Sequence, residues 1–254
     1  MKLINKILHY TVNTNEEVGM WTEKIICDII DIPFKSSRQY INQNNYPYKL
    51  KKDLTCSISK LLTTLQIKEH IGNKNECNDY ICVNNDSISL KTNTSGFKVC
   101  PAKIGQTTLQ QLNKHFRTEF TKQEFKSYIM KNTNDILREY LKYSFICDHL
   151  LSIKFDKGKV YYFKSELSCI KLNVSNFTFT NSLENWNESN TVKVKVNDKL
   201  MSLAEFQIHT NRNCIKCRFN FDTIIEMIRL DLISGIVLQE FDLKYKYNIK
   251  VVKN

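Results

Sequence analysis

Apolar residues at helical spacing mark the first part of the chain. From Asn15 to Ile30 they recur with the period of an α-helix, which predicts an amphipathic helix that Asn13 or Thr14 can cap. The polar residues 35–52 predict a loop, and residues 54–70 predict a second helix. This part of the chain is therefore expected to supply helices that cover a sheet.

The pattern then changes to alternation, which is typical of strands. Tyr80–Val83 and Ser87–Thr92 flank the turn residues Asn84 and Asn85, and together they predict a β-hairpin. Residues 97–100 predict a further short strand. The hairpin is the clearest β-structure in the first half of the chain.

Helical spacing returns over residues 107–151, and strands predominate after it. The predicted strands cover residues 152–155, 160–163, 167–174, 177–180, 192–196, 205–210 and 214–219. Asp222 can cap a helix over residues 223–232. The order of elements predicts an α/β (α+β) fold with a central mixed sheet, flanking helices and a strand-rich C-terminal extension. We place a soft boundary near residue 150, between a core (residues 1–150) and a strand-rich, core-completing region (residues 151–254). The alternative that the whole chain forms one domain stays open.

Length and charge narrow the function. A chain of 254 residues, 42% of them hydrophobic, can bury a core as one large or two small domains. The net charge of +11 favours a polyanion partner, either nucleic acid or an anionic membrane surface. Charge alone also permits a basic protein with no such partner, so the choice depends on motifs.

Cysteine usage and hydropathy bear on the compartment. The nine cysteines show no disulfide-framework spacing, and the first residues lack the features of a secretory signal. No apolar run is long enough to cross a membrane. We expect a cytoplasmic protein with reduced thiols. Cys214 and Cys217 have metal-ligand spacing, but a single pair in a predicted strand is weak support for zinc.

The candidate chemistry lies on the hairpin. Asp79 precedes its first strand, and Ser89 and Lys91 share one face of its second strand, since residues two apart point to the same side. Phosphodiester cleavage needs carboxylates that hold Mg²⁺ and a cation that orients water and offsets charge. Taken singly, each residue is more often a turn former or a solvated side chain.

The segment Asp79 … Ser89-Leu90-Lys91 resembles the PD-(D/E)xK motif of magnesium-dependent nucleases, with serine in place of the second acid. In the relatives that the N-terminal helix resembles, which are the mismatch-repair nickase MutH and similar restriction enzymes, a glutamate on that helix completes the site. Glu23 holds this place after Val18-Gly19-Met20. Glu16 and Glu17 are the alternatives.

This resemblance, over about residues 14–115, implies a type II restriction endonuclease that cuts double-stranded DNA with Mg²⁺. It implies that Asp79, Glu23 and the backbone near Leu90 bind the metal, and that Lys91 orients the attacking water. It further implies a cognate DNA methyltransferase as a genetic partner, and a homodimer if the site is a palindrome. We also expect Gln106 at a helix start, where backbone N–H groups can face a phosphate.

The strands predicted at residues 205–210 and 214–219 form a second hairpin around residues 211–213, and DNA contacts are predicted mainly there. The candidate contact residues are His209, Asn211, Arg212, Asn213, Lys216 and Arg218, with Lys98 and Lys103 after the catalytic hairpin. Arg and Asn can make paired contacts to base edges, and a two-stranded ribbon fits the major groove. Lys193 and Lys195 share a strand face, and the loop 35–52 is a second candidate wall. Phosphate contact alone is the simpler interpretation.

Two alternatives to a restriction enzyme stay open at this point. One is a basic DNA-binding protein with no enzymatic activity. The other is a DNA repair nickase. A binding protein should tolerate Lys91→Ala, whereas a nuclease should lose cleavage and keep its affinity for DNA.

Overall fold

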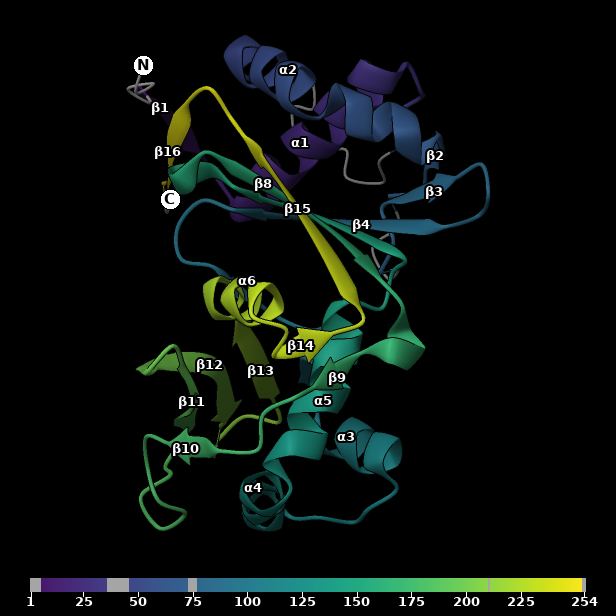
Figure 1. Ribbon diagram of the computed structural model, residues 1–254. Coiled ribbons are helices and arrows are strands. Elements are labelled where there is room, and N and C mark those ends of the chain that lie inside the picture. The colour runs from purple at the N-terminus through teal and green to yellow at the C-terminus, as the bar shows by residue number, and fades with distance from the viewer. Residues whose placement is uncertain (1–5, 36–45, 73–76, 210, 253–254) are drawn as a thin grey trace. The chain divides into compact units, whose positions relative to one another are not determined.

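A computed structural model describes residues 6–35, 46–72, 77–209 and 211–252 (Figure 1). The chain divides into two units. Unit 1 comprises residues 1–96, 147–164 and 238–254, and unit 2 comprises residues 97–146 and 165–237. This division differs from the single boundary expected near residue 150, because the chain returns to unit 1 to complete its sheet.

Unit 1 is built on a six-stranded mixed sheet of order β15-β8-β7-β4-β3-β2. Its strands are β2 (Ile67–His70), β3 (Tyr80–Cys82), β4 (Ser87–Asn93), β7 (His149–Lys154), β8 (Lys159–Ser165) and β15 (Ile236–Asp242). The pairing of β4 with β7 is parallel, while β2–β3, β3–β4 and β7–β8 are antiparallel. A separate parallel pair joins β1 (Ile7–Val12) to β16 (Lys246–Val251), and the short helix η1 (Phe155–Lys157) links β7 to β8.

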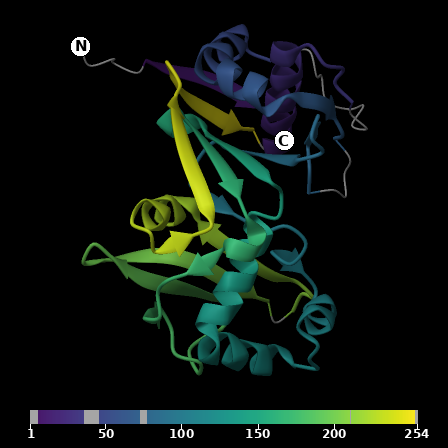
Figure 2. The ribbon, with the colours of Figure 1, turned by 45° about the vertical axis from the view of Figure 1, so that its right-hand side comes forward.

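Helices α1 (Asn15–Ile30) and α2 (Tyr48–Leu65) cover one face of this sheet (Figures 1 and 2). α1 has the predicted bounds, and its Thr14 hydroxyl accepts the Glu17 N–H at 3.2 Å as a cap. The predicted second helix was wrong at both ends. α2 ends before Gln66, whose left-handed backbone (φ 49°) turns the chain into β2.

Unit 2 contains a second sheet of order β10-β11-β12-β13-β5, with β6 also paired to β13. Its strands are β5 (Lys98–Val99), β6 (Gln106–Thr107), β10 (Phe177–Phe179), β11 (Ser189–Val196), β12 (Lys199–Ile208) and β13 (Ile215–Asn220), and β9 (Lys171–Leu172) pairs with β14 (Ile233–Ser234). The helices are α3 (Leu109–Phe116), α4 (Lys122–Lys131), α5 (Thr133–Ser144), η2 (Leu167–Cys169) and α6 (Phe221–Arg229).

The unit 2 sheet has one apolar and one polar face, because side chains alternate along its strands apart from one irregularity in the β11–β12 pairing. Val192, Val194 and Phe206 are fully buried, whereas their neighbours Thr191, Lys193 and Gln207 are partly exposed. The Tyr140 ring of α5 meets the Phe206 ring edge-on at 5.6 Å between centroids. The apolar face therefore packs on helices, and the other face carries the polar side chains.

Three other predicted elements were corrected. The helical stretch ends at Ser144, and residues 149–151 belong to the fully buried strand β7. Residues 167–174 form only a 3₁₀ turn and the two-residue strand β9. α6 begins at Phe221, with the Asn220 side chain rather than Asp222 accepting the capping N–H.

The predicted fold class is confirmed. The chain is α+β, with a central mixed sheet flanked by helices and a strand-rich C-terminal part. Among the described segments, no helix combines the length and the hydropathy needed to cross a bilayer.

Candidate active site

The hairpin of β3 and β4 holds Asp79 against β4. The Asp79 N–H donates to the Ile88 carbonyl at 2.8 Å. Its Oδ2 accepts the Leu90 N–H at 2.5 Å and faces the Ser89 hydroxyl at 3.5 Å. Ser89 therefore lies beside the carboxylate and holds it, and both Oδ2 contacts come from β4. From the described residues, no hydrogen bond reaches Oδ1.

Charges gather around Asp79. Burial raises the pKa of the Asp79 carboxyl, the positive charge of Lys91 lowers this pKa, and the negative charge of Glu23 raises it again. These shifts mean that both predicted partners lie within electrostatic range of Asp79. A buried carboxylate whose charge a neighbouring carboxylate opposes is typical of a site that binds a cation.

Lys91 lies in β4 with its ammonium group available. It is partly exposed and pairs across the parallel ladder with Ser152 of β7. Within the described part of the chain, no hydrogen bond or ion pair engages the Lys91 ammonium group. The cation therefore remains free to interact with a ligand.

Glu23 is oriented by a histidine that the sequence analysis missed. The Glu23 Oε2 lies 3.1 Å from Nε2 of His70, which is fully buried at the end of β2. The His70 Nδ1 accepts the Lys35 N–H at 3.1 Å, so the ring hydrogen is on Nε2 and can be donated to Glu23. The Phe34 ring stacks on the imidazole at 4.7 Å between centroids. Residues 67–70 read Ile-Lys-Glu-His and show no apolar alternation, so no local signal separated β2 from the helix.

The three candidate glutamates of α1 are not equivalent. The Glu17 Oε2 accepts the Asn13 N–H at 2.9 Å, so this side chain serves the helix start. Glu23 is the glutamate of α1 whose charge acts on Asp79. The geometry therefore joins Asp79, Ser89, Leu90, Lys91 and Glu23 in unit 1.

The donor set fits a magnesium ion. No group of three or more His, Cys, Asp or Glu residues in a metal-binding arrangement occurs in the described residues. Mg²⁺ in nucleic-acid enzymes is commonly held by one or two carboxylates, with waters and substrate phosphate completing the shell. Asp79, with a free Oδ1, and Glu23 meet this requirement. Cys217 is fully buried on the apolar face, while Cys214 precedes β13 and is partly exposed, in agreement with the weak zinc prediction.

Gln106 lies in a short strand rather than at a helix start. It belongs to β6 of unit 2 and pairs with Lys216. The helix predicted to start near residue 107 is α3, which Thr108 caps and which begins at Leu109, so Gln106 lies before the cap. The contacts of unit 1 thus give no support to a catalytic role for Gln106, which stays a prediction.

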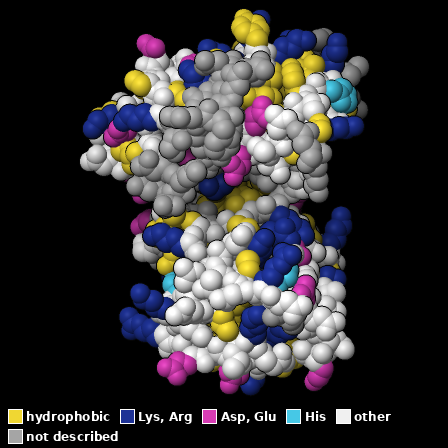
Figure 3. Space-filling view, turned by 180° about the vertical axis from the view of Figure 1, so that it is seen from behind, with side chains coloured by type: hydrophobic (Ala, Val, Ile, Leu, Met, Phe, Trp, Pro, Cys, Tyr) yellow, Lys and Arg dark blue, Asp and Glu magenta, His cyan; other side chains and the backbone are white. Residues whose placement is uncertain are grey.

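The predicted DNA-contact side chains of the second hairpin, together with Lys98, Lys103, Lys193 and Lys195, lie in unit 2, many of them on one surface. The other predicted wall, the loop at residues 35–52, belongs to unit 1; residues 36–45 lie outside the described residues, and residues 48–52 form the start of α2. We call this surface the polar face of the sheet. It comprises Lys98, Gln106, Ser189, Thr191, Lys193, Lys195, Ser202, Glu205, Gln207, Lys216, Arg218 and Asn220. Figure 3, viewed from behind Figure 1, shows several groups of Lys and Arg side chains on the surface of unit 2. Within this set Glu205 is the one carboxylate.

The loop between β12 and β13 carries the remaining candidates. Asn211, Arg212 and Asn213 are exposed. The Lys122 ammonium of α4 donates to the His209 carbonyl at 2.7 Å and to the Arg212 carbonyl at 3.1 Å, so it anchors the loop. Lys103 is likewise exposed, in a turn with φ 59°. Contact of these residues with DNA stays a prediction.

A comparison with known proteins bears on this arrangement. The chain is similar to a restriction enzyme. The type II restriction enzyme CviAII of Paramecium bursaria Chlorella virus 1 is 32% identical to it over 215 residues, which cover 83% of this chain and 59% of CviAII. The chain therefore spans well under the full length of that relative. No family model and no solved structure matches the chain.

The similarity to CviAII extends over both units, because the aligned residues outnumber those of either unit alone. It therefore includes parts of the unit that carries Asp79 and of the unit that carries the polar face.

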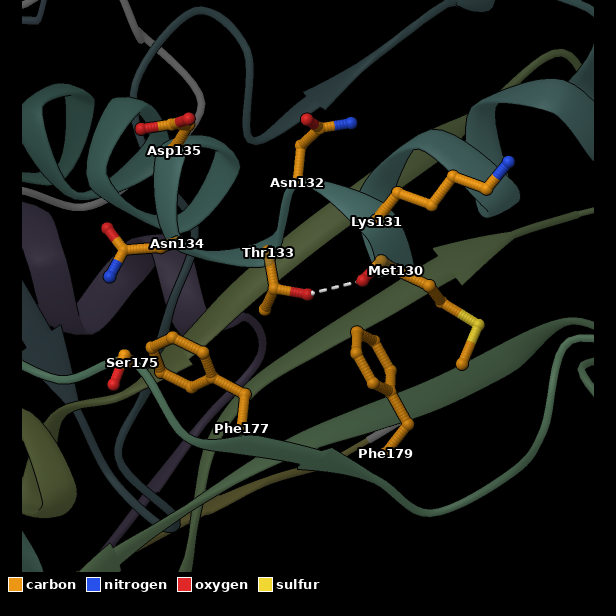
Figure 4. Close-up of a pocket in the computed structure, with 9 residues that line it drawn as sticks. All are labelled: Met130, Lys131, Asn132, Thr133, Asn134, Asp135, Ser175, Phe177 and Phe179. Carbon is orange, nitrogen blue, oxygen red and sulfur yellow. Dashed lines mark hydrogen bonds between the residues drawn. The ribbon is translucent and has the colours of Figure 1, made fainter.

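The hollow drawn in Figure 4 holds none of the predicted site residues. It has a volume of about 360 Å³ and lies between the α4–α5 junction and Phe177 and Phe179 of β10.

Glu205 makes an acid-sensitive contribution to unit 2. Burial alone would raise its pKa, but hydrogen bonds from Lys98 and Gln207 and the charge of Arg218 lower the pKa of Glu205 to about 2. A lowered folded-state pKa stabilises the protein above the unfolded pKa, and this stability is lost as the pH falls toward the folded pKa. Glu205→Gln should therefore be destabilising at pH 7, and the difference from wild type should shrink progressively below about pH 4.5. Urea unfolding between pH 7 and pH 3 measures it, and a constant difference across this range would contradict the assignment.

Proposed function

We propose that this chain is a metal-dependent endonuclease that cleaves double-stranded DNA at a specific sequence, with a PD-(D/E)xK-type site in unit 1. The observation that carries the proposal is the grouping of Asp79, Glu23 and an unengaged Lys91 around one hairpin. The similarity to the restriction enzyme CviAII supports it.

In this proposal Asp79 and Glu23 hold Mg²⁺. When bound, the metal supplies a Lewis acid that stabilises charge on the phosphate oxygens. The Leu90 N–H and the Ser89 hydroxyl fix the Asp79 carboxylate through Oδ2, which leaves Oδ1 for the ion. Lys91 orients the attacking water and offsets negative charge as it develops. His70 keeps Glu23 in place through the 3.1 Å contact.

His70 should act as a positioning residue for the metal site. We expect His70→Leu to raise the Mg²⁺ concentration for half-maximal cleavage by about 10- to 100-fold, because Glu23 loses its orienting donor. Saturating Mg²⁺ should restore most of the rate. Metal titrations of cleavage measure this shift.

His70→Gln is the matched control, because its amide can still donate to Glu23. It should need less Mg²⁺ than His70→Leu. Equal metal requirements for both variants and wild type would show that the contact does not serve metal binding.

Substrate binding is proposed for unit 2, through the polar face and the loop at residues 209–214. If the recognition sequence is a palindrome, a two-fold homodimer places one site on each strand. A cognate methyltransferase would then protect the host DNA from cleavage.

Incubation of the purified chain with plasmid DNA, in Mg²⁺ and in EDTA, tests the proposal. Discrete fragments that require Mg²⁺ are the expected result. Retained DNA affinity without cleavage in any divalent metal, on methylated and unmethylated DNA, would favour a binding protein. Nicked circles without linear products would favour a repair nickase.

A further inference from the structure

An unusual carboxylate lies within the polar face of unit 2. Glu205 of β12 accepts hydrogen bonds from four side chains on four strands or strand ends. Its Oε1 accepts from the Ser189 hydroxyl at 3.1 Å and the Gln207 amide at 2.9 Å. Its Oε2 accepts from the Lys98 ammonium at 2.8 Å and the Arg218 guanidinium at 3.1 Å.

These four donors occupy the acceptor capacity of the carboxylate, which offers about four lone-pair sites. Glu205 therefore has no acceptor left for a base amino group. Its partners, in contrast, keep further N–H groups, since Lys98 carries three and Arg218 carries five, of which the Nε–H is buried and leaves the terminal N–H groups for a ligand. The side chain of Glu205 is 14% exposed, against 33% for Arg218 and 53% for Lys98. The carboxylate is thus the buried centre of a more exposed ring of donors.

A ring of this kind suits a base edge better than a phosphate. An ionised carboxylate beside a phosphate would oppose binding, and a phosphate site needs only cations. Holding Arg218 in one orientation instead fixes the direction of its donors and lowers the entropy lost on binding. A fixed guanidinium matches the two acceptors that guanine presents in the major groove.

The surroundings leave room for such a contact. A hollow of about 180 Å³ lies on the polar face, and its lining includes Lys98, Thr191, Glu205, Arg218 and Asn220. Lys193 and Lys195 lie on the same face of β11, where they can reach the DNA backbone.

We propose that Glu205 is a positioning residue for sequence recognition, which holds Arg218 to read a guanine in the major groove of double-stranded DNA. The inference builds on the proposed function and adds a specificity determinant to it. The two residues have different roles: the Glu205 carboxylate holds the donors in place, and Arg218 contacts the base.

Selection from a library of randomised duplexes tests the inference. Binding by the full chain is measured in Ca²⁺, a larger oxygen-binding cation of the same charge, and in EDTA. Arg218→Ala should lose discrimination for guanine at one position of the site, or at its symmetry mate, by about 10- to 100-fold. Glu205→Gln should lose it at the same position, and Glu205→Asp should restore part of it.

Two variants serve as controls. Lys193→Ala removes a cation from the same face and should weaken binding to all sequences alike, with a salt dependence reduced by about one charge. Glu184→Gln removes an exposed carboxylate of unit 2 that lies outside the polar face, and it should leave the selected sequence unchanged.

The outcomes separate this inference from the proposed function. If wild type selects a sequence and Glu205→Gln keeps every preference, the inference fails while the nuclease proposal stands. If Glu205→Gln instead weakens binding to all sequences equally, the role is structural and the inference also fails. If wild type selects no sequence under either condition, sequence-specific recognition itself fails, and the inference fails with it.

Discussion

Asp79→Asn should reduce DNA cleavage by at least about 10³-fold while affinity for DNA is unchanged or increases. The substitution removes a negative charge from a ligand of the proposed metal ion and leaves its hairpin contacts available to the amide oxygen. Removal of that charge also lessens repulsion of the phosphate backbone. Cleavage assays and fluorescence-anisotropy binding to one duplex measure both effects.

Lys91→Ala should give a similar separation of cleavage from binding, with a loss of about 10²- to 10³-fold. Lys68→Ala is its matched control, because Lys68 is an exposed lysine of β2 in the same sheet. Lys68→Ala should cleave at the wild-type rate. Cleavage at the wild-type rate by Asp79→Asn or Lys91→Ala would show that the hairpin is not part of the active site.

Asp53→Ala should destabilise unit 1 by about 3–5 kcal/mol. Asp53 of α2 is 4% exposed and accepts three hydrogen bonds, from the backbone N–H groups of Lys244 and Tyr245 at 2.7 and 3.0 Å and from the Tyr247 hydroxyl at 2.8 Å. Alanine would leave the buried Tyr247 hydroxyl and two partly buried backbone N–H groups without their acceptor, and each loss costs free energy. Urea unfolding measures the loss.

The two tryptophans allow the effect to be located. Trp21 lies in the core of unit 1 and Trp186 in unit 2, so fluorescence of the Trp186→Phe protein reports on unit 1 alone. Lys52 is an exposed neighbour of Asp53 on α2, and Lys52→Ala is the control. It should leave the free energy of unfolding within about 0.5 kcal/mol of wild type. If the unfolding transition reported by Trp21 is unchanged in the Asp53→Ala protein, the hydrogen bonds of Asp53 contribute little to the stability of unit 1.

Local patterns predicted the parts of the site that neighbouring residues determine. α1 has a regular apolar stripe, and the hairpin follows from alternation around Asn84 and Asn85. The relation of Asp79 to β4 needs only that hairpin, which is why their contact could be predicted.

What sequence patterns missed depends on distant segments. β7 is buried on both faces and pairs in parallel with β4, so it lacks alternation and was assigned in part to a helix. His70 faces Glu23 only because Gln66 ends α2 in a left-handed turn. Asp53 lies on a helix face, and nothing local distinguishes it from a solvated carboxylate.

The pairing of β1 with β16 has a consequence for synthesis on the ribosome. Unit 1 is discontinuous, and its first strand, β1, cannot pair until residues 246–251 have been synthesised. The segments of unit 2, in contrast, are all synthesised once residue 237 has been made. Contacts between such distant segments form late and slow folding. All segments of unit 2 are thus present before the last segment of unit 1. The surroundings of Asp79 reach their final structure only after the strand at residues 246–251 has been synthesised.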